Sequence, residues 1–471
     1  MPDHTLIKGY FWAPSQPEIK RYGEITISED SSKFSLNLKG FLPPFQPILY
    51  NFNYHDKIPI INGFSNDKDW LTVGGLRIQN ILGSIGHDLT SNQTTEVELN
   101  ADYLVISSKQ TTLSQLNSIK KLSFSPQFSN RYEVESTIEC DFSSNNNEGT
   151  GFLTQEGEFF NYKLIPGKAI EIKFDAGKCT FKPDYYSLPF DPQDKLDITK
   201  EYDFIFEMNT TISLTEMGLF LIKMRRLFSL LVGTYVSLDN IKVWAENSFY
   251  KYYFQGNKSN VYYPSGIRMD NRIADLNTIV KLNTLNNFLS GYNNIQLPLS
   301  HYFDFIESGK DMPHQELLLL ISALEVMFNR TYDVENSRLD DYPKIAKEIL
   351  ALDCLTKHQK NFLKTFKKGT RIKTFKIRDK ILKLIEDSNT LVQLVREPND
   401  FVSEILEVRH YIVHEANPST LELYNNEIKL RQYNMRLKVI LEYYLLLNIG
   451  FKQEYLDEKI HRTLTNMAQF R

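Results

Sequence analysis

The chain has 471 residues, of which 42% are hydrophobic, 13% aromatic and 24% charged, and its formal net charge at pH 7 is -4. A chain of this length usually forms more than one domain, and this composition is that of a folded globular protein. The net negative charge excludes a protein that coats nucleic acid over its whole surface, because such proteins are strongly basic.

The cysteines are Cys140, Cys179 and Cys354, and none belongs to a Cys-x-x-Cys pair. This pattern indicates neither a disulfide framework nor a thiolate zinc site. The first residues lack the basic and apolar regions of a secretory signal. The most apolar stretches, 317–324 and 437–447, are shorter than the roughly 20 residues that a membrane-spanning helix needs. We therefore expect a cytoplasmic protein that makes no membrane contact.

Short runs of alternating apolar and polar residues fill the chain from about residue 5 to residue 200. The segments 23–38 (GEITISEDSSKFSLNL) and 131–142 (RYEVESTIECDF) are typical of half-buried strands. The polar run 143–151 (SSNNNEGTG) and the pair Pro166-Gly167 are typical of turns. Many short strands separated by turns favour a β-sandwich.

The pattern changes at residues 214–232 (LTEMGLFLIKMRRLFSLLV), where apolar residues recur at helical spacing. This spacing predicts one buried amphipathic helix. Strand character returns at 241–265, so we expect the helix to pack against the sheet of the same domain. Residues 1–300 are thus predicted to form a β-sandwich-like domain with a packed helix.

Beyond residue 300 the sequence becomes helical. The segment 313–328 (PHQELLLLISALEVMF) begins with a proline, which suits the first turn of a helix, and it is apolar on most faces. Further helices are predicted at 342–352, 358–366, 372–386, 400–413 and 423–451. This succession predicts an all-α bundle over residues 301–471, so the predicted fold class of the whole chain is α+β.

The run RHYIVH places Arg409 and His414 five positions apart near the end of a helical segment. A guanidinium that holds a phosphate and an imidazole that moves a proton are enough to cleave RNA, by attack of the ribose 2′-hydroxyl on the phosphodiester, without a metal. His410 is a third candidate, which would orient the phosphate or share the proton transfer. The alternative for His410 is an ordinary surface side chain.

The helix must end close to His414 for Arg409 and His414 to meet one phosphate. Five residues of regular helix rotate by roughly 140°, so the two side chains would diverge on an unbroken helix. The following residues 416–418 (ANP) end in a proline, and the residue before a proline is disfavoured in a helix. The sequence therefore predicts that the helix ends near His414.

A second feature is the basic segment from Lys357 to Lys383, which has eleven Lys or Arg residues and one acidic residue, Asp379. Backbone phosphates favour such a segment, and interleaved aromatic side chains can stack on bases. The residues that we expect to contact RNA are Lys364, Lys367, Lys368, Arg371 and Lys373. The alternative is a solvated helical surface whose Phe side chains point into the core.

Other candidate sites are weaker. The run 71–75 (LTVGG) lacks the lysine of a phosphate-binding loop, and nothing in the sequence indicates a metal or a cofactor. Glu316 and Glu325 lie on broadly the same side of one predicted helix. We expect them to anchor a neighbouring helix, with Arg409 as one candidate partner.

Taken together, these residues resemble a HEPN ribonuclease domain. The resemblance rests on the Arg-x4-His motif of Arg409 and His414, with a polar residue directly after the Arg, in a helical domain that opens with LLLLISALEVMF. The β-rich half before it resembles, more narrowly, the ApeA group of HEPN proteins from bacterial abortive-infection defence against phages. That part of the resemblance rests on 8–12 (KGYFW), 61–64 (INGF) and the helix at 214–232.

The resemblance implies a metal-independent endoribonuclease of antiviral defence. Its active site would form where two helical domains pair, so a homodimer is expected, with both copies of Arg409 and His414 facing one groove. Transfer RNA is a candidate target. The N-terminal domain would sense infection, with a phage-derived trigger protein as a candidate partner, or restrain the nuclease. The alternative is a catalytically silent protein whose N-terminal domain binds a protein or glycan while the helical domain only dimerises.

Overall fold

The structure is a computed structural model, and it divides into two compact units, Met1–Asn286 and Asn287–Arg471. The residues that it describes are 5–28, 33–40, 42, 58–82, 96–110, 113–127, 137–142, 151–153, 159–165, 169–187, 198–245, 248–257, 276–307, 312–332, 349–351, 355–366, 376–414 and 424–468.

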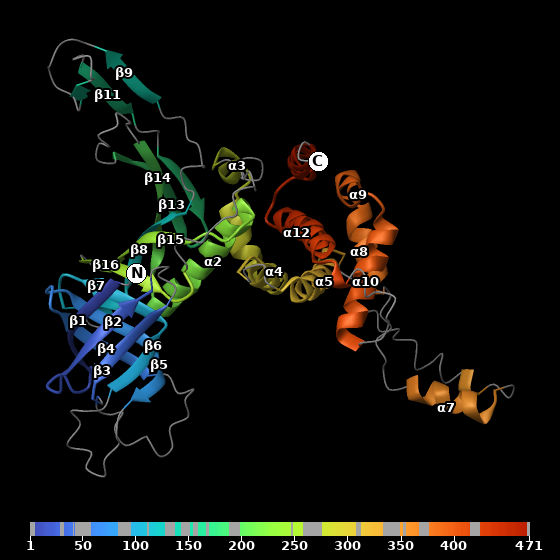
Figure 1. Cartoon of the computed structure of the whole chain (residues 1–471), viewed down its shortest axis with the longest axis horizontal. Helices are drawn as coiled ribbons and strands as arrows, with labels where there is room; N and C mark the ends of the chain where they lie inside the picture. Colours follow the sequence, from blue (N-terminus) through green and yellow to red (C-terminus); the bar gives the residue numbers. More distant parts are fainter. Residues whose placement is uncertain are drawn as a thin grey trace. The chain divides into compact units, whose positions relative to one another are not determined.

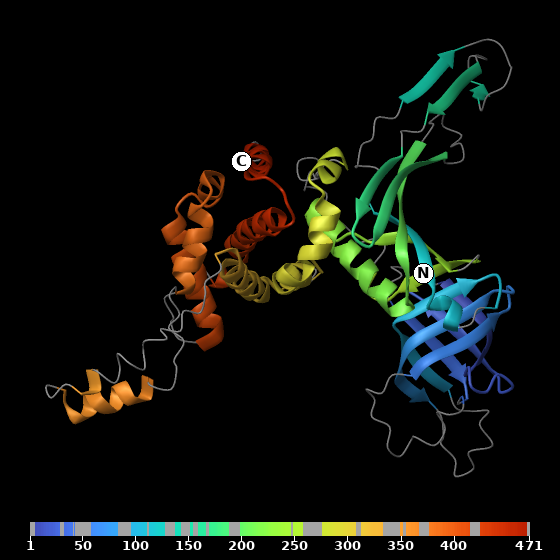
Figure 2. The same ribbon diagram turned by 180° about the vertical axis from the view of Figure 1, so that it is seen from behind.

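The N-terminal unit contains a closed, six-stranded antiparallel barrel, drawn in blue in Figures 1 and 2. Its strands are β1 (Thr5–Trp12), β2 (Arg21–Ile27), β3 (Phe34–Lys39), β4 (Ile58–Ser65), β5 (Trp70–Leu82) and β6 (Glu96–Ala101). Their hydrogen-bonded order is β5-β4-β1-β2-β3-β6, and β6 pairs again with β5, which closes the barrel. Alternate residues face inward and fill the interior, among them Phe11, Ile25, Leu36 and Ile61.

The predicted β-sandwich is wrong for this part of the chain, because the sheet closes on itself instead of facing a second sheet. The closure depends on β5, whose residues 70–76 pair with β4 while residues 77–82 pair with β6. Gly75 lies two residues before this change of partner, with a φ of 65°. A Cβ atom there would overlap the side chain of Asp102. Only glycine adopts this conformation without strain, so Gly75 allows β5 to turn from one neighbour to the other.

On the other side of β5 the sheet leaves the barrel. It continues, in this order, through β7 (Tyr103–Ser107), β16 (Ser248–Phe254), β15 (Leu238–Ala245), β8 (Ile119–Pro126), β14 (Ile198–Ile212), β13 (Gly177–Ser187) and β12 (Ile170–Phe174). A short helix, α1 (Leu113–Leu116), precedes β8. A separate sheet has the order β10-β11-β9, from β9 (Thr137–Phe142), β10 (Gly151–Leu153) and β11 (Phe159–Ile165). The turns predicted at residues 143–150 and 166–167 lie outside the described residues.

One long helix, α2 (Leu214–Val232), packs against this part of the sheet, as the sequence predicted. Ser213 caps its N-terminus, and Gly233, with a φ of 75°, ends it. The Phe228 ring lies 4.6 Å from the ring of Phe204 on β14 and 5.9 Å from that of Phe124 on β8, measured between centroids. The helix and the sheet therefore share one aromatic core.

The C-terminal part is helical, as predicted. Its helices are α4 (Thr284–Glu307), α5 (Pro313–Thr331), α7 (Lys357–Phe366), α8 (Ile377–Glu386), α9 (Asn389–Val395), α10 (Pro398–His414), α12 (Glu427–Asn448) and α13 (Gln453–Ala468), and the shorter α3 (Leu276–Lys281) precedes them. Helices α3, α4, α9 and α13 were not predicted, and most of the helix predicted at 342–352 lies outside the described residues. No helix in the described ranges combines the length and the hydropathy that a membrane crossing requires.

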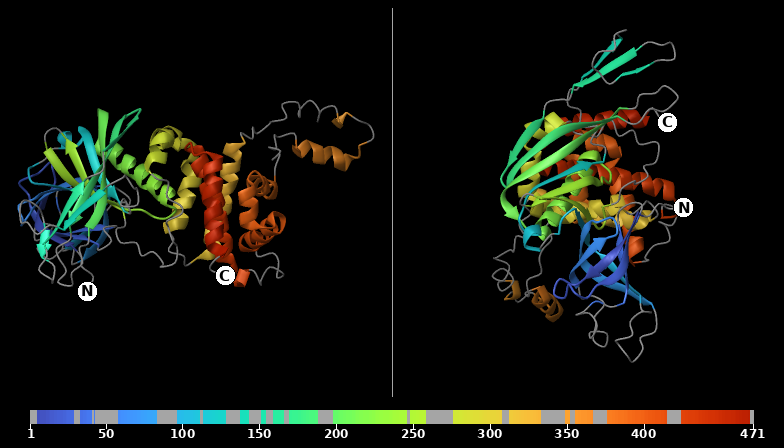
Figure 3. Two further views of the ribbon diagram at one scale, coloured as in Figure 1. Left: turned by 90° about the horizontal axis from the view of Figure 1, so that it is seen from above. Right: turned by 90° about the vertical axis from the view of Figure 1, so that its left-hand side faces the viewer.

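Helices α5 and α12 lie side by side at the centre of this unit (Figure 3). Both helices carry fully buried apolar side chains, including Leu320 and Leu324 of α5 and Leu437 and Leu441 of α12. Polar contacts tie other helices to α12. Tyr444 donates a hydrogen bond to the Leu384 carbonyl oxygen of α8 at 2.7 Å, and Tyr302 of α4 donates one to Glu442 at 2.8 Å. These contacts fix α12 among its neighbours.

Candidate active site at the end of α10

Helix α10 carries the Arg-x4-His motif. It begins at Pro398, and Asp400 lies in its first turn, where a negative charge interacts favourably with the helix dipole. Phe401, Val402, Ile405 and Val408 are buried along one face, which packs against α5, α8 and α9. This buried face holds the last turn of α10, in which the motif residues follow Val408.

The structure places the three candidate catalytic residues at one end of the helical unit. Arg409 is half-buried, and His410 and His414 are exposed. His414 still belongs to α10, and the residues that follow it lie outside the described part of the chain, so the predicted end of the helix near His414 stays a prediction. His410 and His414 are one turn apart, so they share a face, and the centroids of their rings are 4.8 Å apart at an interplanar angle of 51°. The closest pair in the motif is therefore His410 and His414.

Arg409 leaves the helix in a different direction from His414. Five residues of regular helix separate their directions by roughly 140°. Among the described residues, no hydrogen bond or ion pair engages the Arg409 guanidinium. Arg409 is thus available to a ligand, and within one chain it does not point to the side on which His414 lies.

Tyr424 connects the last turn of α10 to the start of α5. The Tyr424 ring centroid lies 4.8 Å from that of Tyr411 on α10 and 4.1 Å from that of His314 on α5. The His314 Nε2 atom is 2.8 Å from the Tyr424 carbonyl oxygen. A carbonyl oxygen only accepts hydrogen bonds, so the Nε2 atom of His314 carries a proton in this contact. We call His314, Tyr411 and Tyr424 the Tyr424 cluster.

The start of α5 is held by a buried amide from α12. Asn434 donates hydrogen bonds to the Pro313 carbonyl oxygen at 2.8 Å and to the Glu316 carboxylate at 3.1 Å. Both Asn434 and Glu316 are buried. Buried polar contacts of this kind are costly to break. The start of α5, which carries His314, is therefore held rigidly.

The two glutamates of α5 anchor neighbouring helices, as expected. Glu316 bonds Asn434 of α12, and the Lys380 ammonium of α8 forms an ion pair with Glu325 at 3.1 Å. Arg409, which was one candidate partner, forms an ion pair with neither glutamate among the described residues. The acidic side chains of α5 therefore do not neutralise the positive charge of the Arg409 guanidinium.

The predicted RNA-contacting lysines are not placed. Lys364 lies on α7, but its side chain is outside the described part, and Lys367, Lys368, Arg371 and Lys373 lie outside the described residues altogether. In contrast, the structure adds His314 and Tyr424, which sequence reasoning did not select. His314 lies directly after the proline that opens α5, but it is far from α10 in the sequence, so only the fold shows that the two meet.

Two family models match this chain. The model described as ApeA N-terminal domain 1 matches residues 6–294, and the model described as Apea-like HEPN matches residues 318–455. The second match includes all of α10 and therefore Arg409, His410 and His414. Comparisons with curated proteins and with solved structures gave no match. The chain belongs to the ApeA-like HEPN proteins, with an ApeA N-terminal domain followed by an Apea-like HEPN domain.

Proposed function

We propose that this protein is a metal-independent endoribonuclease of antiviral, abortive-infection defence. The main support for this proposal is that the Arg409 and His414 motif is complete. It lies in the last described turn of α10, inside the region that the Apea-like HEPN model matches. The HEPN domain is a ribonuclease-type fold typical of defence systems. Both motif residues retain the groups that phosphodiester cleavage requires.

In the proposed reaction, one histidine removes the proton from the ribose 2′-hydroxyl, and the 2′-oxygen attacks the adjacent phosphorus. The bond from phosphorus to the 5′-oxygen breaks, and the second histidine protonates that oxygen. We assign His414 and His410 to these two steps, because their rings are 4.8 Å apart on one face. Arg409 stabilises the charge that develops on the phosphorane oxygens. The products carry a 2′,3′-cyclic phosphate and a 5′-hydroxyl.

The directions of the side chains support a site built from two copies of the chain. On one helix Arg409 and His414 diverge, so a phosphate that meets both is best placed between two motifs. Large apolar side chains are exposed next to the Tyr424 cluster, namely Met312 at 54%, Val413 at 49% and Ile428 at 73%. Apolar residues exposed in this way are typical of a contact surface. We therefore propose a homodimer through the HEPN domain.

The remaining parts of the proposal concern control and substrate. The ApeA N-terminal domain would sense infection through a phage-derived trigger protein or restrain the nuclease. Transfer RNA is the proposed target. The basic segment that includes Lys364, Lys367, Lys368, Arg371 and Lys373 would contact the RNA backbone, which favours positive charge in a protein that is acidic overall. The protein would act in the cytoplasm.

The test is to incubate the purified protein with total cellular RNA in the presence of EDTA and to map new 5′ ends. The same experiment with His414→Ala is the comparison, and lysate from infected cells is added in a second series to supply a trigger. Discrete cuts made only by the unmodified protein would support the nuclease. If neither series yields cuts, the protein is instead a silent binding protein whose helical domain dimerises.

A further inference from the structure

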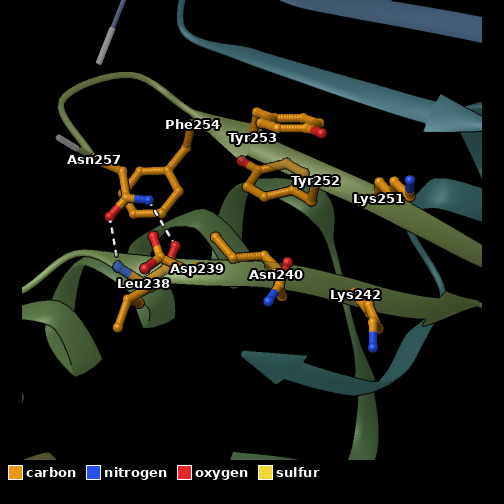
Figure 4. Close-up of a pocket in the computed structure, with 10 residues that line it drawn as sticks. Leu238, Asp239, Asn240, Lys242, Lys251, Tyr252, Tyr253, Phe254 and Asn257 are labelled. Carbon is orange, nitrogen blue, oxygen red and sulfur yellow. Dashed lines mark hydrogen bonds between the residues drawn. The ribbon is translucent and has the colours of Figure 1, made fainter. Parts of the chain in front are cut away.

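The sheet of the N-terminal unit opens between two neighbouring strands. Strands β15 and β16 pair only from Lys242 opposite Lys251 to Ala245 opposite Ser248. Beyond Lys242 the pairing of the two strands stops at an irregularity in β15, whose register shifts between Asp239 and Lys242 and whose Asn240 has a φ of 51°. A cavity of about 270 Å³ occupies this gap. Its residues come from both strands and from the turn after β16 (Figure 4).

The Asn257 side chain closes one end of the gap, because its amide pairs with the backbone of β15 as a neighbouring strand would. The Asn257 amide donates to the Leu238 carbonyl oxygen at 2.7 Å and accepts from the Leu238 backbone N–H at 2.8 Å, and Figure 4 shows both bonds. The ladder at Lys242 and Lys251 closes the other end. An extended chain therefore has no passage through the gap. The pairing of Asn257 with Leu238 indicates, however, that the edge of β15 can bind a group that offers one hydrogen-bond donor and one acceptor.

The two walls of the cavity differ in chemistry. Along β16, Tyr252 and Phe254 lie on the face that Arg225 of α2 contacts, and Tyr253 lies on the opposite face. Along β15, Asp239, Asn240 and Lys242 lie opposite them (Figure 4). The Ser237 hydroxyl lies 3.1 Å from an oxygen of the Asp239 carboxyl group. Burial raises the pKa of Asp239, so its carboxyl group lies in a partly dry environment where a hydrogen bond is worth more. A planar ring with a hydrogen-bonding edge would fit between these walls.

The mouth of the cavity carries two opposed positive charges. Lys242 and Lys251 are direct cross-strand partners, and like charges in this position repel each other. Within the described part of the chain, neither ammonium forms an ion pair. The same sheet contains a second opposed pair, Lys173 and Lys178, but there Lys178 bonds Glu171 at 3.4 Å and Glu207 at 3.1 Å. An anion between Lys242 and Lys251 would neutralise their positive charges, as Glu171 and Glu207 do for Lys178.

We propose that this cavity binds a small nucleotide, with the base between the aromatic wall of β16 and the polar edge of β15, and the phosphate at Lys242 and Lys251. The cavity volume limits the ligand to a single nucleotide, because it lies just below the range of about 300–1,000 Å³ that is usual for ligand pockets. The closed end is rigid. The carbonyl oxygen of Gly256, directly before Asn257, accepts hydrogen bonds from Tyr235 at 2.7 Å and from Arg225 of α2. The nucleotide site does not depend on the proposed nuclease.

The test is isothermal titration calorimetry of the full chain with AMP, GMP, CMP and UMP and with inorganic phosphate. We expect at least one nucleotide to bind with a Kd below about 1 mM and at least tenfold more tightly than phosphate. The double variant Lys242→Gln, Lys251→Gln should weaken that nucleotide about tenfold or more, because charged hydrogen bonds to phosphate are lost. The control is Lys173→Gln, Lys178→Gln, which removes the same charge from an opposed pair and should leave binding unchanged.

A third variant, Asp239→Asn, tests the base subsite. It keeps the size of the side chain and should change the order of preference among the four nucleotides while phosphate binding stays the same. Thermal unfolding of each variant shows whether it is folded. We expect no loss of stability from the Lys242 and Lys251 changes, because they relieve a repulsion, whereas the control also loses the exposed ion pairs of Lys178. The proposal is overturned if no nucleotide binds, if phosphate binds as tightly as every nucleotide, or if the Lys242 and Lys251 variant binds like the unmodified protein.

Discussion

The imidazole rings of His410 and His414 lie on successive turns of α10 with their centroids 4.8 Å apart, and both are exposed. This arrangement puts two proton-transfer groups on one face of a helix. Arg409, the residue before His410, leaves the helix about 140° away from His414. In the proposed reaction, the acid and the base would therefore come from one chain, and a second copy would supply the Arg409 that faces them.

If His410 and His414 act as acid and base, the pH dependence of kcat/KM for RNA cleavage should be bell-shaped. Each single change, His410→Ala or His414→Ala, should lower cleavage by about 10²–10⁴-fold and remove one limb of the profile. His461→Ala, an exposed histidine of α13 outside the motif and the basic segment, is the control and should retain the full profile. If His410→Ala keeps both limbs, His410 is an ordinary surface residue and a water or another group performs the second transfer.

The roles of Arg409 and His414 in separate copies can be tested by mixing two inactive variants. Arg409→Ala and His414→Ala should each lose about 10²–10³-fold in cleavage. In a symmetric dimer, a mixed pair holds one site with an intact Arg409 from one copy and an intact His414 from the other. After subunit exchange, the mixture should therefore regain about a quarter of the unmodified activity. Regained activity is not expected if both residues act from one chain, and its absence would contradict the two-copy site.

Local signals in the sequence predicted single elements well. The helix α2 was predicted with its observed bounds from its apolar spacing, which is a local signal, and the serine and glycine that cap it are local as well. The start of α5 at Pro313 was likewise predicted, because proline suits the first turn of a helix. Both results depend on residues within a few positions of the feature itself.

Contacts between distant segments were not predictable in this way. Strand alternation is the same in a sandwich and in a barrel, so the closure of β6 onto β5, which requires the bend at Gly75, could not be read from periodicity. The contact of His314 with Tyr424 joins segments separated by 110 residues. The cavity between β15 and β16 depends on which strands pair with β8 and β7, and no local pattern in the sequence states that.

The barrel should be sensitive to a methyl group at Gly9. A Cβ atom there would overlap the Phe64 carbonyl oxygen and lie 2.8 Å from the Ser65 Cα atom, both in the backbone of the paired strand β4. We expect Gly9→Ala to lower the free energy of unfolding by about 2–4 kcal/mol, because neither strand can move without breaking the ladder. Urea denaturation measures this change.

The matched control for Gly9 is Gly291 in the interior of α4. A Cβ atom at Gly291 would have no heavy atom within 4 Å. Gly291→Ala should therefore raise stability by about 0.5–1 kcal/mol, because alanine loses less backbone entropy than glycine on entering a helix. If both variants change stability equally, the close approach of β1 and β4 at Gly9 is not the cause.

Cys179 should be protected from alkylation in the folded protein. Its side chain is fully buried in β13, between β12 and β14, and burial raises the pKa of the thiol well above its ordinary value. Since the thiolate is the reactive form, iodoacetamide at pH 8 should label the peptide that contains Cys179 only after unfolding in urea. Mass spectrometry of that peptide measures the labelling, and equal rates with and without urea would contradict the burial.

The same thiol predicts a fall of stability with rising pH. Because the pKa of Cys179 is raised in the folded state, the folded protein keeps the proton at pH values where the unfolded chain, with a thiol pKa of about 8.5, has lost it. Stability is therefore present below about pH 8.5 and decreases above it, by at most about 1.4 kcal/mol per pH unit. Burial raises the pKa of Tyr103 to about 12, so it adds a decrease in the same direction only above about pH 10. Unfolding of the unmodified protein and of Cys179→Val between pH 7.5 and pH 9.5 separates the two, because only the unmodified protein should lose the thiol contribution there.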